Sequence, residues 1–152
     1  MQMKFQQILG IDPGVSGGAA FISEALTGAQ TIAFSKVTPS DICAWLVNKK
    51  IDMCYLEAVH SMPAQGVAST FKFGKNAGWW EGVLMALEIP FQRVYPLKWQ
   101  TFMSCRTGGN KNVSKARAQE LFPRTKVTHA IADALLIAEY GRRQSRPNAS
   151  DL

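Results

Sequence analysis

The first part of the chain alternates short apolar runs with glycine-containing turns. Residues 5–11 and 17–22 are apolar and rich in strand-forming side chains, and residues 29–35 follow after another glycine turn. Runs of this length bounded by turns predict three strands joined as a meander. Residues 39–50 begin with Pro-Ser-Asp and then place apolar side chains at helical spacing, which predicts a helix packed on the sheet.

The second part of the chain alternates strand-length and helix-length patterns. Residues 51–59 form an apolar run typical of a strand buried on both faces, and residues 64–87 predict a long helix despite three glycines spaced four apart. The remaining predicted elements are a strand over 91–95 and helices over 97–105, 113–121 and 129–140, with a mobile loop at 107–112. This order predicts an α/β fold with a five-stranded mixed sheet flanked by helices.

Length, charge and cysteine content narrow the class of protein. With 152 residues and 47% hydrophobic side chains, we expect one domain over residues 1–143 and a flexible, polar and basic tail over 144–152. Lys and Arg number 17 against 11 Asp and Glu, which favours a polyanionic partner. The three cysteines include no CxxC pair, so we expect reduced thiols and a cytoplasmic protein. No apolar run is long enough to predict a membrane span.

Three acids stand inside otherwise apolar segments: Asp12, Glu57 and Asp133. A buried carboxylate costs several kcal/mol unless it is paired or binds a cation. If the first and fourth strands are neighbours, Asp12 and Glu57 meet at their carboxyl ends, and a helix laid against them brings Asp133. Such a cluster favours Mg²⁺ or Mn²⁺, and two ions about 4 Å apart can assist phosphodiester cleavage. His129 lies one helical turn before Asp133 and faces the same way.

Each of these residues also has a structural explanation when it is taken alone. An acid can cap a helix, accept backbone hydrogen bonds or lie in water at a sheet edge. A single histidine is more often a surface or core residue than a ligand. The sequence pattern leaves both explanations open.

Four motifs in order carry a resemblance to a known family. The resemblance extends over residues 7–143 and is carried by IDPG, LEAVHSMPAQGVASTFKFGKNAG, VYPLKW and ADALLIAEYGRR. In these motifs the chain resembles the RuvC-type Holliday junction resolvases, closest to the small bacteriophage members. The resemblance implies a ribonuclease-H-like (RNase H-like) fold. It also implies a homodimer that binds four-way DNA junctions and other branched DNA and nicks opposed strands, with two Mg²⁺ or Mn²⁺ ions per active site.

The same resemblance assigns roles to individual residues. Asp12, Glu57 and Asp133 correspond to metal-binding acids, and His129 stands where most members carry a fourth acid. Because imidazole nitrogen suits Mn²⁺ better than Mg²⁺, this departure bears on metal preference. Two lysines, Lys98 and Lys115, are expected to face the scissile phosphate as catalytic residues, and Lys111 is the alternative to Lys115.

The resemblance also predicts a DNA-binding surface and a dimer contact. We expect aromatic or planar stacking on bases by His60, Phe71 and Phe73, although a core position explains the two phenylalanines equally well. The expected cationic contacts, each of which could also be a solvated side chain, are Lys72, Lys75, Arg106, Lys111 and Arg117. The dimer contact is expected to use Trp79, Trp80 and the glycine ridge formed by Gly74, Gly78 and Gly82.

Three other interpretations compete with a junction-cutting nuclease. GIDPGVSGG also resembles the first phosphate loop of actin-like and Hsp70-like ATPases, but this chain has no second glycine-rich phosphate loop. A non-catalytic junction binder would keep the sheet and the basic surface. Another RNase H-fold nuclease would act on branched DNA or on RNA:DNA hybrids.

Overall fold

The fold is known from a computed structural model that describes residues 6–23, 28–58 and 63–145. Its strands are β1 (Ile8–Asp12), β2 (Gly18–Ile22), β3 (Gln30–Ala33), β4 (Met53–Glu57) and β5 (Phe91–Val94). Its helices are the short 3₁₀ turn η1 (Phe34–Lys36) and α1 (Pro39–Val47), α2 (Val67–Ala86), α3 (Pro96–Phe102), α4 (Lys111–Leu121) and α5 (His129–Gln144).

The five strands form one mixed sheet in the order β3-β2-β1-β4-β5. β1 pairs antiparallel with β2, and β2 pairs antiparallel with β3, so the first three strands are the predicted meander. β4 lies parallel to β1, and β5 lies parallel to β4. The predicted five-stranded mixed sheet is therefore confirmed, as is the expectation that the first and fourth strands are neighbours.

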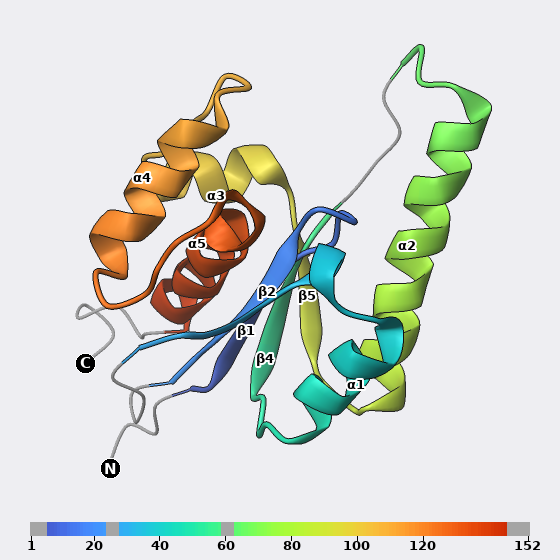
Figure 1. The fold of residues 1–152 in the computed structure, drawn as a ribbon, viewed down its shortest axis with the longest axis horizontal. Helices are drawn as coiled ribbons and strands as arrows, with labels where there is room; N and C mark the ends of the chain where they lie inside the picture. Colours follow the sequence, from blue (N-terminus) through green and yellow to red (C-terminus); the bar gives the residue numbers. More distant parts are fainter. Residues whose placement is uncertain (1–5, 24–27, 59–62, 146–152) are drawn as a thin grey trace.

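Helices cover both faces of the sheet (Figure 1). α3, α4 and α5 lie on one face, and α1 and α2 lie on the other. Side chains alternate between two cores, as expected for strands buried on both sides. In β1, Ile8 belongs to the core beneath α5, whereas Leu9 and Ile11 belong to the core beneath α1 and α2.

The closest contact between layers is the approach of α5 to the backbone of β1. A Cβ added to Gly10 would lie closer than 3.0 Å to the carbonyl oxygen of Ala134 and to the amide nitrogen of Ala138. A Cβ on Gly141 of α5 would meet the ring of Tyr55 in the same way. Real Cβ atoms do not approach so closely, so glycine at these positions sets the depth at which α5 packs.

α1 begins at Pro39, as predicted, and Thr38 adds a cap that the sequence analysis did not predict. Thr38 accepts a hydrogen bond from the Asp41 amide at 3.2 Å, and the Asp41 carboxylate accepts one from the Thr38 amide at 2.8 Å. This reciprocal arrangement is a capping box, with Pro39 in the first turn where its missing N–H has no cost. The helix then buries Ile42 and Leu46 against the sheet.

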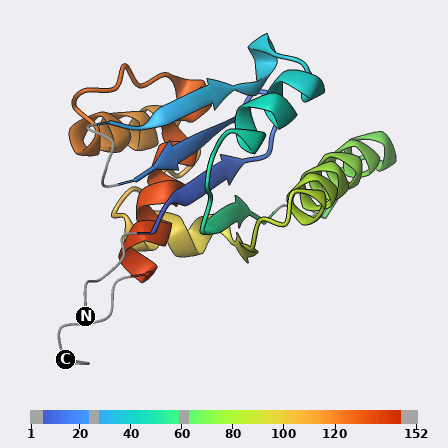
Figure 2. The ribbon, with the colours of Figure 1, turned by 90° about the horizontal axis from the view of Figure 1, so that it is seen from below.

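The two halves of α2 have different surroundings. The second half buries Trp80 and Leu84 in the core, whereas every side chain of residues 67–75 is exposed. Figure 2 shows α2 standing to one side of the sheet. A Cβ added to Gly74, Gly78 or Gly82 meets no atom within 4 Å, so the glycine ridge faces open space.

One predicted member of the dimer contact lies in the wrong place. Trp80 is only 1% exposed, and its ring packs against Phe34 with centroids 4.9 Å apart. The prediction that Trp80 takes part in a subunit contact is therefore wrong, because its indole fills the core of its own chain. Trp79 is half-buried beside it.

Several predicted boundaries need correction. Phe34 belongs to a 3₁₀ turn rather than to the end of the third strand, and Lys111 is the first residue of α4 rather than part of a mobile loop. α5 continues to Gln144, beyond the predicted end at residue 140, because Glu139 forms ion pairs with arginines in the last turn. Thr128 takes the N-cap position of α5, but its side chain makes no capping hydrogen bond.

The cysteines and the helices bear on two further expectations. Cys43, Cys54 and Cys105 are all free thiols, and the last two are buried. Within the described ranges, none of the helices combines the length and the apolar character that crossing a bilayer requires. The predicted tail lies outside the described residues from position 146 onward.

The close packing at Gly10 can be tested with one methyl group. We expect Gly10→Ala to lower the free energy of unfolding by about 3 kcal/mol or more, because its Cβ overlaps the α5 backbone and neither backbone can move aside cheaply. Urea denaturation followed by circular dichroism measures this change. The matched control is Gly28→Ala, at an exposed glycine where an added Cβ meets no atom within 4 Å, so stability should change by less than about 0.5 kcal/mol. Equal stability of Gly10→Ala and the unaltered protein would contradict the described docking of α5.

Candidate active site

The turn after β1 holds Asp12 in place. The amide of Gly17 donates to the carbonyl of Gly14 at 2.8 Å and closes a tight turn. The Gly14 amide approaches the Asp12 carboxylate at 3.5 Å, a long contact. A Cβ on Gly17 would lie closer than 3.0 Å to the carbonyl oxygen and the carboxyl carbon of Asp12. The glycine therefore leaves room for the carboxylate beside the returning chain.

The pleat of the sheet directs Asp12 and Glu57 toward the same face. The parallel register of β1 and β4 pairs Ile11 with Leu56, so Asp12 and Glu57 are the next residues along. Ile11 and Leu56 face α1 and α2. Since successive side chains alternate, the two acids point toward α5.

α5 brings two more predicted residues to this place. A pocket of about 280 Å³ is lined by all four candidate ligands, Asp12, Glu57, His129 and Asp133, together with Gly14, Ser16, Gly17, Lys111 and Ser114. The acids are half-buried, whereas His129 is exposed at the first turn of α5. Residues far apart in the sequence thus line one pocket.

Burial and mutual repulsion raise the pKa values of the acids. Burial, with the nearby Asp133 charge, raises the pKa of Asp12 to about 6. Burial, then the charges of Asp12 and Asp133, raise the pKa of Glu57 to about 8, although a hydrogen bond from Trp99 acts in the opposite direction. Burial also raises the pKa of Asp133. A positive charge in this pocket would relieve the cost of ionising all three.

Lys111 supplies part of that positive charge. Its ammonium partly offsets the rise in the pKa values of Asp12 and Asp133. Lys111 is exposed and lines the pocket from the first turn of α4, one turn before the buried Ser114. A lysine in this position can contact the phosphate of a substrate that enters the pocket.

The donor set fits hard divalent cations. Asp133 Oδ1 is buried and accepts no hydrogen bond from the described residues. This oxygen could therefore serve as a ligand to a cation. Carboxylate oxygens with one imidazole nitrogen suit Mg²⁺ or, better, Mn²⁺. Among the described residues, no three side chains converge closely enough to form a preassembled metal cluster.

Two residues with contacts to the acids were missed by the sequence analysis. The indole Nε1 of Trp99 donates to Glu57 Oε2 at 2.7 Å, and Trp99 is fully buried. The side chain of Ser114 forms a hydrogen bond that lowers the pKa of Asp133. Spacing offered a signal for Ser114, since it lies on the same helical face as Lys111. Trp99 had none, because its contact joins positions 42 residues apart.

The two predicted catalytic lysines lie outside the acid pocket. Lys98 is exposed on α3 and lines a separate groove with Phe102 and Tyr140. Lys115 is half-buried on α4 and does not line the acid pocket. Of the lysines considered for the scissile phosphate, the geometry favours Lys111.

The predicted DNA-binding residues have varied surroundings. Phe71 and Phe73 are 70% and 42% exposed, so the alternative that they are core residues is wrong. Arg117 donates to the Met103 carbonyl and pairs with Glu120, so its guanidinium already has partners within the chain. Among the other basic residues predicted to contact DNA, Lys72, Lys75 and Arg106 are exposed, as is Lys111. His60 lies outside the described residues.

Comparisons with known proteins identify the fold. No family model matches the chain, and no curated protein matches it. Among solved structures, Thermus thermophilus RuvC in complex with a Holliday junction substrate matches with a TM-score of 0.63 and 15% identity, covering 92% of this chain and 96% of that chain. This chain has a RuvC-like, RNase H-like fold. A second Thermus thermophilus RuvC structure matches at 0.62 and 14%, covering 91% and 96%.

The raised pKa values predict how stability depends on pH when metal is absent. Glu57 titrates near 4.5 in the unfolded chain and near 8 in the folded one, so between these values the folded state binds more protons. Stability from this group therefore falls as pH rises from about 4.5 to about 8, and Asp12 adds the same sign between 3.8 and about 6. We expect melting temperatures in EDTA to fall across this window.

Two comparisons isolate the contribution of Glu57. Glu57→Gln should flatten the fall in melting temperature above pH 6, where Glu57 alone of the two still titrates. Glu88→Gln, at an exposed position, is the matched control and should leave the profile unchanged. Mn²⁺ should raise the melting temperature most at the alkaline end, where the acids are ionised. A profile that Glu57→Gln leaves unaltered would refute the repulsive cluster.

Proposed function

We propose that this protein is a structure-selective endonuclease that binds four-way DNA junctions and nicks opposed strands by metal-assisted hydrolysis. The observation that carries the proposal is the convergence of Asp12, Glu57, His129 and Asp133 on one pocket that also contains Lys111. The RuvC-like fold supports it, because a solved structure of this fold holds a Holliday junction substrate. The enzyme would hydrolyse phosphodiester bonds of DNA junctions during recombination.

The four candidate ligands would hold the metal ions at the end of β1. Asp12 and Glu57 approach from the sheet, and His129 and Asp133 approach from α5. Two bound Mg²⁺ or Mn²⁺ ions would supply an activated water and stabilise the leaving oxygen. Lys111 would contact the phosphate oxygens and hold the strand against the pocket. The buried Trp99 would fix the orientation of Glu57.

Exposed aromatic and basic side chains support a DNA-binding role. Phe71 and Phe73 project from the exposed half of α2, where stacking on unpaired bases is possible. Lys72 and Lys75 lie beside them, and Arg106 precedes α4. Neutralisation of phosphates by these residues would make affinity fall steeply with salt.

We also propose an assembly, a domain extent and a family relation for this chain. The open ridge of Gly74, Gly78 and Gly82 leaves room for a second helix to approach α2, which supports a homodimer suited to a junction with two-fold symmetry. We propose a single nuclease domain over residues 1–143. From the sequence motifs we propose a relation to the small bacteriophage members of the RuvC-type resolvases, and from the unpaired cysteines a cytoplasmic location.

A labelled synthetic four-way junction tests the activity directly. Incubation with Mg²⁺ or Mn²⁺ should give nicks on opposed strands, and Asp12→Asn should abolish nicking because it removes a ligand oxygen's charge. The same variant should bind the junction at least as well, since one charge that repels phosphate is gone. Gel shift and denaturing electrophoresis measure the two properties separately.

The possible outcomes separate the competing functions. Binding without nicking in any metal would identify a non-catalytic junction binder. Preferred cleavage of flaps or RNA:DNA hybrids would identify another nuclease of this fold. Loss of binding as well as nicking in Asp12→Asn would mean that Asp12 has a structural role.

A pair of lysines on one helix tests the phosphate contact. We expect Lys111→Gln to slow single-turnover nicking by about 10²–10³-fold, the usual effect of removing one preorganised charge from a transition state. Lys115→Gln lies one turn further along α4 and outside the pocket, so it should have a much smaller effect. A larger effect of Lys115→Gln would show that the phosphate contacts α4 one turn further along, outside the acid pocket.

A further inference from the structure

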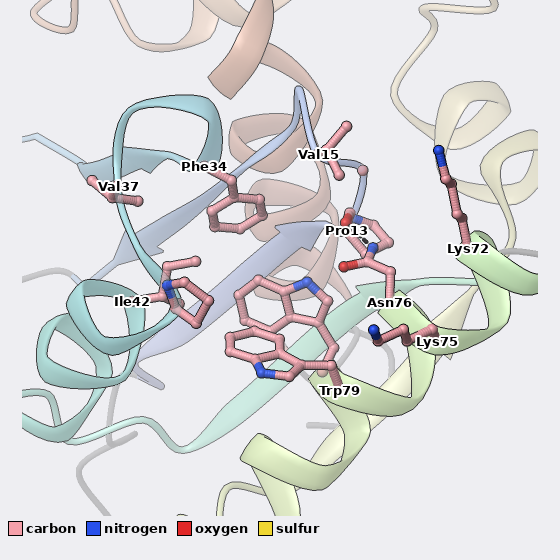
Figure 3. Close-up of a pocket in the computed structure, with 12 residues that line it drawn as sticks. Pro13, Val15, Phe34, Val37, Ile42, Lys72, Lys75, Asn76 and Trp79 are labelled. Carbon is pink, nitrogen blue, oxygen red and sulfur yellow. Dashed lines mark hydrogen bonds between the residues drawn. The ribbon is translucent and has the colours of Figure 1, made fainter.

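A second pocket, of about 390 Å³, is lined by the turn after β1 and by side chains of α1 and α2 (Figure 3). Asp12 and Glu57 point to the other face of the sheet. Gly14 lines both pockets, so the turn that follows Asp12 forms part of each wall. Asp12 points toward α5, whereas Pro13 and Val15 line the second pocket together with side chains of α1 and α2. A strand of substrate that passes over this turn would reach both.

The second pocket is lined mostly by apolar side chains, together with Lys72 and Lys75. Figure 3 shows Phe34 and Ile42 on one side and Trp79 on the other, with Lys75 nearby. Asn76 donates a hydrogen bond to the Pro13 carbonyl and so fastens α2 to the turn. No acid is among the described residues that line the pocket. Flat aromatic surfaces beside ammonium groups are the features that recognise a nucleotide.

We propose that this second pocket binds one unpaired nucleobase of the strand whose phosphate enters the acid pocket. The proposal rests on the proposed function and names a base-binding subsite for it. The base lies against Trp79 and Phe34, and Lys75 contacts an adjoining phosphate. The volume is within the range of small-ligand pockets, about 300–1,000 Å³, and admits a single base but not a duplex.

Charge favours a nucleic acid over a second copy of this chain as the occupant. The chain carries a net charge of +6, and two of its lysines, Lys72 and Lys75, line the pocket. A phosphodiester brings charge of the opposite sign to these two lysines, whereas a second copy seated in the pocket would not. The homodimer proposed above uses the glycine ridge of α2, and Gly74, Gly78 and Gly82 do not line this pocket. The proposal therefore assigns Trp79 to the base and not to the dimer contact. Phe71 and Phe73 do not line this pocket, so the subsite is distinct from the stacking proposed for them.

An abasic-site series tests the subsite without altering the protein fold. Junctions that lack one base at successive positions around the mapped nick are titrated with the Asp12→Asn variant, which does not cut. We expect one position, next to the nick, where loss of the base weakens binding roughly tenfold. Because the change is in the DNA, this measurement stands even if a pocket variant fails to fold.

A variant then links that position to the pocket. Trp79→Leu, placed in the same background, should weaken binding to the intact junction by a similar factor and should cause no further loss on the sensitive abasic junction. Trp79→Phe should restore the dependence on the base. Met85→Ala removes an exposed apolar side chain from the same helix, outside the pocket, and should change neither affinity.

Each other result has a defined meaning. Equal affinity for every abasic junction, or losses from Trp79→Leu and the abasic site that simply add, would overturn the base-binding subsite while leaving nicking intact. A change of oligomeric state in Trp79→Leu with unchanged dependence on the base would identify a second copy as the occupant and overturn the proposal. Failure of the unaltered protein to bind junctions would instead overturn the proposed function.

Discussion

The depth at which α5 lies on β1 is the constraint on which the rest of this structure depends. The α5 backbone contacts the strand at Gly10, where any side chain would overlap Ala134 and Ala138. Asp133 directly precedes Ala134, so the same contact that closes the core fixes how far Asp133 lies from the end of β1. A small displacement of this helix would lower the packing density of the core and would also move Asp133 away from Asp12 and Glu57. Stability and the candidate chemistry therefore both depend on this one contact.

That closeness has an electrostatic cost. Burial raises the pKa values of Asp12, Glu57 and Asp133, and repulsion from neighbouring acids raises those of Asp12 and Glu57 further. Lys111 offsets part of the repulsion but contacts the pocket from an exposed helical turn. Ionising all three acids of such a site is costly, and a bound cation would lower that cost. Acids with raised pKa values in one pocket are typical of sites where charge serves chemistry rather than stability.

The parts that sequence could predict are those governed by short periods. The alternation of strand side chains and the strand order place Asp12 beside Glu57, and one helical turn places His129 beside Asp133. The parts that it could not predict depend on contacts between distant segments. Trp80 resembled an interface residue until its packing against Phe34 was known, and the hydrogen bond from Trp99 to Glu57 has no local signature. Lys111 was assigned to a loop because a helix start after two glycines with positive φ is hard to position.

The turn after β1 gives one segment two different tasks. Alternation along the strand sends Asp12 to the α5 face and Pro13 to the α2 face, while the tight closure from Gly14 to Gly17 keeps both close to the carboxyl end of β1. The hydrogen bond from Asn76 to the Pro13 carbonyl ties α2 to the same turn. If a base enters beside Trp79, its binding energy can therefore act on the backbone that carries Asp12, so that recognition of the base and positioning of the carboxylate are coupled through a single rigid turn.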